Sequence, residues 1–136
     1  LSVRNAVNEQ FKVQHPEQEH IQSLNLVRIC DKPLHPDADS KNTVVFGIGQ
    51  VDRSPCGTGT CAEMAMLHAK GMLQLGEDFI SESIIGTLFK GKIIEKTKVG
   101  NLDAVIPEVE GTAHITGFSQ FVRDPLDPLK DGFLVR

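Results

Sequence analysis

The alternation of apolar and polar positions predicts two helices and several strands along this chain. Val3, Val7 and Phe11 lie at helical spacing, which indicates an amphipathic helix over residues 2–12. Residues 31–42 contain two prolines and three aspartates and predict a surface loop. The segments whose alternation or β-branched composition predicts strands are 23–30, 43–46, 79–84, 87–95, 102–109 and 112–121.

The second predicted helix, residues 58–70, has the composition of a buried element. Apolar side chains occupy most of its positions, so it should be enclosed by other structure. Thr58 or Thr60 is expected to cap its start, with Glu63 completing a capping box for Thr60, and Gly71 should end it. Because many strands follow one buried helix, we predict a mixed α/β domain in which a mostly antiparallel sheet curls around this helix.

The C-terminal tail is expected to be irregular, because it contains two prolines and a glycine beyond residue 124. Three phenylalanines should pin it to the body of the domain: Phe118, Phe121 and Phe133.

Composition limits the classes of function. A length of 136 residues, 40% of them hydrophobic and 24% charged, suits one globular domain. The net charge of −4 argues against a nucleic-acid partner. No apolar run approaches the ~18 residues of a membrane span, so we expect no membrane association and a cytoplasmic location.

The three cysteines do not form a disulfide framework, and we expect them to be reduced thiols. Cys30 and Cys61 are interpreted as core residues. Cys56 differs, because it follows Pro55 and precedes a Gly-Thr-Gly-Thr turn that leads into a helix. The unpaired N–H groups of a helix N-terminus bind anions and stabilise a thiolate, so Cys56 is the candidate reactive group.

The residues around this cysteine also carry a family resemblance. Asp52 to Thr60, read as DRSPCGTGT, resembles the second half-motif of the proline racemases, a family of cofactor-independent racemases and epimerases related to diaminopimelate epimerase. Further segments occur in family order: Asn8-Glu9, His15-Pro16-Glu17, Glu82 to Gly86, Ile115 to Phe118 and Asp124 to Pro128. The resemblance therefore extends over nearly the whole chain.

The resemblance implies an architecture and partners. The family fold is an α/β half-barrel repeated about a pseudo-dyad, and this chain would be the C-terminal half, residues 1–136 forming one domain. An N-terminal half of comparable size would then be missing and would carry a second catalytic cysteine. The resemblance also implies a homodimer that needs no cofactor and no metal.

The implied reaction is the interconversion of L- and D-proline by two cysteines, one acting as base and the other as acid on opposite faces of Cα. Cys56 would be one of them. The N–H groups of Gly57, Thr58 and Gly59 would bind the substrate carboxylate, which stabilises the charge that develops in the transition state. By resemblance, Asp52 would accept hydrogen bonds from the substrate ammonium group. Phe46 would form an apolar wall against the ring.

Other functions are also compatible with the sequence. The 4-hydroxyproline 2-epimerases of the group tend to have a smaller or polar residue at the position of Phe46, so an aromatic residue favours proline. A related dehydratase of 3-hydroxyproline has threonine in place of Cys56, which disfavours dehydration. A different class of function would be a non-catalytic fragment that binds a small carboxylate, or a redox-sensing protein that uses Cys56 with Cys61.

Overall fold

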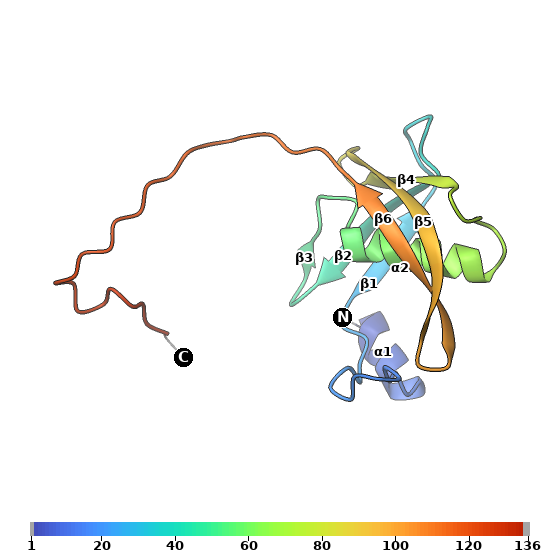
Figure 1. The fold of residues 1–136 in the computed structure, drawn as a ribbon, viewed down its shortest axis with the longest axis horizontal. Helices are drawn as coiled ribbons and strands as arrows, with labels where there is room; N and C mark the ends of the chain where they lie inside the picture. The colour runs from blue at the N-terminus through green and yellow to red at the C-terminus, as the bar shows by residue number, and fades with distance from the viewer. Residues whose placement is uncertain (1, 135–136) are drawn as a thin grey trace.

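The computed structural model describes residues 2–134, which contain two helices and six strands. No helix in this part of the chain is both long and apolar enough to cross a bilayer. In chain order the elements are α1 (Ser2–Gln10), β1 (Val27–Asp31), β2 (Ser40–Phe46), β3 (Gln50–Val51), α2 (Gly57–Ala69), β4 (Asp78–Ser83), β5 (Leu88–Val99) and β6 (Leu102–Glu110), as shown in Figure 1.

The strands form one mixed sheet in the order β1-β2-β4-β5-β6, with the short β3 paired to β2. Neighbouring strands are antiparallel except β2 and β4, which run parallel. Parallel neighbours need a long crossover connection, and here α2 supplies it. The helix lies against β5 and β6, and the loop that follows β3 leads directly to its N-terminus (Figure 1).

The hydrophobic core lies between α2 and the sheet. Its buried members are Met64, Leu73, Phe79 and Ile93. Gly91 on β5 allows the close approach of the helix, because a Cβ atom at Gly91 would lie 2.7 Å from Sδ of Met64.

The predicted fold class, a mixed α/β domain, is confirmed. The sheet is nevertheless open, and α2 is less enclosed than its composition predicted, because the sheet covers one side of it. Only Thr60 and Met64 of α2 are buried, and Met66 is 45% exposed. The apolar residues on the uncovered side therefore face solvent or a cavity.

Two predicted boundaries near the start of the sheet were wrong. Pairing of β1 with β2 begins only at Val27, so residues 23–26 of the predicted strand are not paired. The predicted loop 31–42 ends earlier, because β2 starts at Ser40 and continues through the buried Asn42. The Asn42 amide NH2 donates to Oγ of Ser81 at 2.9 Å and to the carbonyl of Glu82 at 3.1 Å, so a polar side chain is held inside the sheet by its donors and does not mark a loop.

The described tail beyond residue 124 is irregular, as predicted, but two other predictions for the C-terminal part of the chain were wrong. Residues 112–121 form no strand, and Figure 1 shows the chain leaving the end of β6 and running away from the body. Phe118, Phe121 and Phe133 are 95%, 94% and 72% exposed, so they do not pin the tail. Alternation alone cannot make a strand where no partner strand lies alongside within the described residues.

Candidate active site

Cys56 occupies the N-cap position of α2, in place of the predicted caps Thr58 and Thr60. Its backbone has φ 63°, and it is the one residue other than glycine with positive φ in the described part of the chain. The backbone N–H of Gly59 donates to Cys56 Sγ at 3.3 Å. The thiol therefore takes the place of the oxygen that usually caps a helix, and it accepts a hydrogen bond from the positive end of the helix dipole.

Short-range hydrogen bonds build the loop that presents this cysteine. The N–H of Ser54 donates to Oδ1 of Asp52 at 2.9 Å, and the N–H of Cys56 donates to Oγ of Ser54 at 3.1 Å. The N–H of Asp52 donates to the carbonyl of Val44 on β2 at 2.9 Å, which ties the loop to the sheet. One carboxylate oxygen of Asp52 thus shapes the loop, as such turns commonly require.

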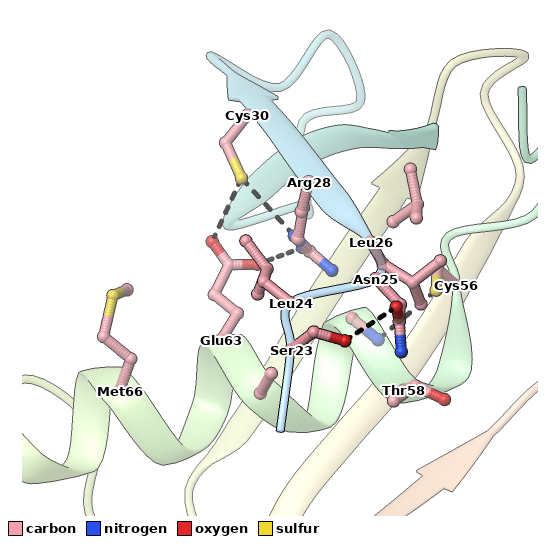
Figure 2. A pocket seen from close by; sticks show the side chains of 13 residues that line it. Ser23, Leu24, Asn25, Leu26, Arg28, Cys30, Cys56, Thr58, Glu63 and Met66 are labelled. Carbon is pink, nitrogen blue, oxygen red and sulfur yellow. Dashed lines mark hydrogen bonds and ion pairs between the residues drawn. The ribbon is translucent and has the colours of Figure 1, made fainter. Parts of the chain in front are cut away.

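A cavity of about 510 Å³ lies between α2 and the segment that leads into β1. Cys56 lies at one end near Thr58, and Arg28, Cys30 and Glu63 lie toward the other (Figure 2). Leu24, Leu26, Val44, Ala62 and Met66 contribute apolar lining. The volume is in the range of sites for small molecules, and an apolar wall with a few polar groups is typical of them.

The cavity brings together only part of the predicted site. Of the predicted residues, Cys56, Thr58 and Gly59 line it. Asp52 and Gly57 belong to the same loop and helix start but are not among the lining residues. Phe46 lies at the end of β2 and is 40% exposed, so the structure does not place it against the cavity in this chain.

Sequence reasoning missed an ion pair that lies beside the thiol loop. Arg28 of β1 pairs with Glu63 of α2, and their side chains are only 13% and 11% exposed. Glu63 was interpreted as a capping-box partner of Thr60. The available signal was an arginine within an otherwise apolar strand and a lone acidic residue within an apolar helix, since such charges are buried only when they are paired.

The other two thiols differ from each other. Cys61 packs against the core cluster, as predicted. Burial raises the pKa of the Cys61 thiol, and the neighbouring Cys56 raises it further. Cys30 was predicted to be a core residue, but it is exposed, because it lies on an edge strand of the sheet. Within the described residues, no group of three or more His, Cys, Asp and Glu side chains is arranged to hold a metal ion.

The family described as proline racemase matches residues 1–134 of this chain. The proline racemase of Acetoanaerobium sticklandii is 58% identical over 135 residues, which are 99% of this chain and 40% of that protein. The proline racemase of Clostridioides difficile is 56% identical over 136 residues, which are 100% of this chain and 41% of that protein.

A solved structure agrees with these relatives. A hydroxyproline epimerase from Agrobacterium vitis, with bound trans-4-hydroxy-L-proline, superposes with a TM-score of 0.78 at 36% identity and covers 98% of this chain and 38% of its own. The chain therefore belongs to the proline racemase family. It spans about 40% of the length of the curated relatives that it matches.

Proposed function

We propose that this chain supplies one of the two acid/base cysteines of a proline racemase, and that the remainder of a longer protein supplies the other. The observation that carries the proposal is Cys56 at the N-terminus of α2, where its Sγ accepts the N–H of Gly59 and faces a cavity of about 510 Å³. The residue is only 8% exposed, and its sulfur lies at the wall of the cavity, where a small ligand bound in the cavity would contact it.

In the proposed reaction, the Cys56 thiolate removes the Cα proton of proline while a thiol on the opposite face delivers another proton. The two cysteines exchange protonation states with each turnover, and the reverse reaction uses them in the opposite roles. The N–H groups of Gly57 and Thr58 belong to the first helical turn, which lacks intrahelical acceptors. They are suited to bind the carboxylate, onto which negative charge spreads as the proton leaves.

Asp52 is the candidate partner of the substrate ammonium group. Its Oδ1 accepts the N–H of Ser54, and a carboxylate has further lone pairs that can accept from a ligand. A role in the loop and a role in binding are therefore compatible. No cofactor is needed for this chemistry, because both proton transfers use side chains of the protein.

The proposal is tested with this chain and with the full-length protein. L-Proline is incubated with each in D2O, and optical rotation and deuterium incorporation at Cα are followed. We expect racemisation by the full-length protein, its loss in Cys56→Ala, and none by residues 1–136 alone, because one thiol cannot reach both faces of Cα. Racemisation by the isolated chain that persists on dilution and in Cys61→Ala would refute the two-cysteine scheme.

Epimerisation of 4-hydroxyproline is the second candidate. It is favoured by the structural similarity to the epimerase with bound trans-4-hydroxy-L-proline. Phe46 does not line the cavity of this chain, but by the family resemblance an aromatic residue at this position favours proline, since a hydroxyl group would lack a hydrogen-bonding partner there. Competition between the two substrates in the full-length protein distinguishes these functions.

A redox role for Cys56 with Cys61 fits the structure poorly. The two residues are five positions apart at the start of a helix, a separation of roughly 7.5 Å along the axis. That exceeds the Cα separation of disulfides, and Cys61 packs toward the core. A disulfide between them would require the first turns of α2 to unwind. Binding of a small carboxylate without catalysis predicts that calorimetry detects proline binding to the full-length protein while proline gains no deuterium at Cα in the same incubation.

A further inference from the structure

Arg28 connects three elements beneath the thiol loop. Its guanidinium forms the ion pair with Glu63 of α2 and also donates to Oγ of Ser81 on β4 at 3.3 Å. Its Nε lies 3.4 Å from Sγ of Cys30 on its own strand. Because the planar guanidinium has five donors in a fixed arrangement, these contacts define the position of the group.

A further contact runs from Arg28 toward Cys56 through Thr60. Nη1 of Arg28 lies 3.5 Å from Oγ1 of Thr60, and Thr60 is fully buried. The same hydroxyl donates to the carbonyl of Pro55 at 3.1 Å. A threonine hydroxyl has one hydrogen, so with that hydrogen directed to Pro55 it can act only as an acceptor toward Arg28. One hydroxyl can therefore accept from Arg28 and donate to Pro55 at the same time.

The Pro55 carbonyl, which accepts from the Thr60 hydroxyl, belongs to the peptide that immediately precedes Cys56. A left-handed conformation at a residue other than glycine costs on the order of 1–3 kcal/mol and persists only where surrounding contacts hold it. Cys56 has this conformation, with φ 63°. The Thr60 hydroxyl holds the Pro55 carbonyl on one side of Cys56, and the N–H of Thr60 donates to the Cys56 carbonyl at 2.9 Å on the other.

Arg28 also approaches the residue that donates to the thiol. A Cβ atom at Gly59 would lie 3.1 Å from Nη1 of Arg28 and 3.2 Å from Sγ of Cys56. Gly59 is thus packed between the guanidinium and the sulfur. The guanidinium therefore helps to keep Gly59 in the position from which its N–H donates to the sulfur.

We infer that Arg28, through Thr60, is a positioning residue that fixes the Pro55 carbonyl, holds Cys56 in its positive-φ conformation and so directs the Cys56 thiol. Glu63 balances the buried charge of Arg28. This inference rests on the proposed function only for its effect on catalysis, because the orientation of the thiol is measurable without substrate.

The test uses variants of Thr60 and of the Arg28–Glu63 ion pair. Thr60→Val removes the hydroxyl, and Thr60→Ser retains it. The pair Arg28→Met with Glu63→Gln removes both charges, so that no unpaired charge stays buried. The matched control is Lys41→Met with Glu82→Gln, another ion pair of low exposure, 18% and 3%, that joins β2 to β4. Thermal melts identify the variants that fold.

Cys56 alkylation by iodoacetamide is measured by peptide mapping from pH 6 to 10. We expect Thr60→Val and the Arg28/Glu63 pair to lower the rate of Cys56 alkylation across this profile by roughly 2- to 13-fold, the equivalent of one lost hydrogen bond to the loop. Thr60→Ser and the control pair should keep the parental profile. Two independent variants are used so that the result does not depend on the folding of one.

In the full-length protein, kcat for proline should fall roughly 10- to 100-fold in Thr60→Val, with KM changed less than about threefold, because a misplaced base slows proton transfer more than it weakens binding. Unchanged alkylation profiles in both variants would overturn the inference, even if the protein racemises proline. If the profiles change but the parent protein does not racemise proline, the positioning role stands and the proposed reaction fails.

Discussion

The backbone N–H of Gly59 donates to the Sγ of Cys56 across the first turn of α2, at 3.3 Å. This contact makes the candidate reactive thiol the cap of its own helix, so the position of the sulfur depends on the geometry of the first turn. A change that displaces the first turn of α2 should therefore also displace the sulfur.

Cys56 should react with iodoacetamide before Cys61. Burial and the proximity of Cys56 raise the pKa of Cys61, so less of its thiolate is present at neutral pH. Peptide mapping at short times at pH 7.5 checks the order. The exposed Cys30 is changed to serine, so that a freely accessible thiol does not consume the reagent. Earlier modification of Cys61 would contradict the assignment of Cys56 as the reactive group.

Gly59→Ala should lower both stability and thiol reactivity. The added Cβ would approach Arg28, Cys56 and Val44 within 3.1 to 3.2 Å, and overpacking of this kind costs about 1–3 kcal/mol. Gly57→Ala is the matched control, since nothing lies within 4 Å of its added Cβ. Urea unfolding compares the two free energies, and equal values would show that Gly59 is not closely packed.

Glu82 should make the fold sensitive to acid. The N–H of His35, the N–H of Leu34 and the ammonium of Lys41 hold the pKa of the Glu82 carboxyl below its usual value. A lowered folded-state pKa gives a contribution that is full above the unfolded-state pKa and is lost as the pH falls through the folded-state value.

Thermal melts from pH 7 to 3 measure this contribution. Glu82→Gln should be less stable at pH 7 and should lose less of its remaining stability on acidification. The control is Asp103→Asn, whose carboxyl also has a lowered pKa, because of Lys98, but whose side chain is 95% exposed. Solvent screens that pair, so its removal should have little effect. Parallel pH profiles for Glu82→Gln and the parent chain would contradict the prediction.

Phe46→Ser should shift preference from proline toward 4-hydroxyproline in the full-length protein. Replacing an apolar ring with a hydroxyl changes discrimination by roughly 1–3 kcal/mol, or about tenfold or more in the ratio of kcat/KM values. Polarimetry with each substrate measures this ratio. Val51→Ser, on the neighbouring strand β3 and similarly exposed at 44%, is the control. If both variants leave the ratio unchanged, Phe46 has no part in specificity.

Chymotrypsin should cut this chain first in its tail. Phe118 and Phe121 are almost fully exposed, and their backbone is not part of any strand. Cleavage requires local unfolding, which costs nothing in such a segment and a large fraction of the global stability in the core. Mass spectrometry of early products should show loss of the tail with the body intact. Phe79, 3% exposed, is the internal control, and early cleavage after it would contradict the fold of the body.

Features of this protein that depend on neighbours in the chain were predictable. The helix over 58–70 was predicted to within one residue at each end, because a glycine-rich turn, a run of good helix formers and Gly71 are local signals. Cys56 was predicted to be the reactive group in the same way, from the residues that flank it. The detail that failed was the cap, because a cysteine with positive φ is too rare at that position to be expected.

The features that the sequence did not predict depend on contacts between distant segments. Arg28 and Glu63 are 35 positions apart, and no periodicity indicates that they meet. The buried start of β2 depends on partners in β1 and β4, and the tail remains unpaired despite its alternation. Burial of a charge or of a polar strand is stable only when a complementary group from another element is present, and that element is brought there by the fold.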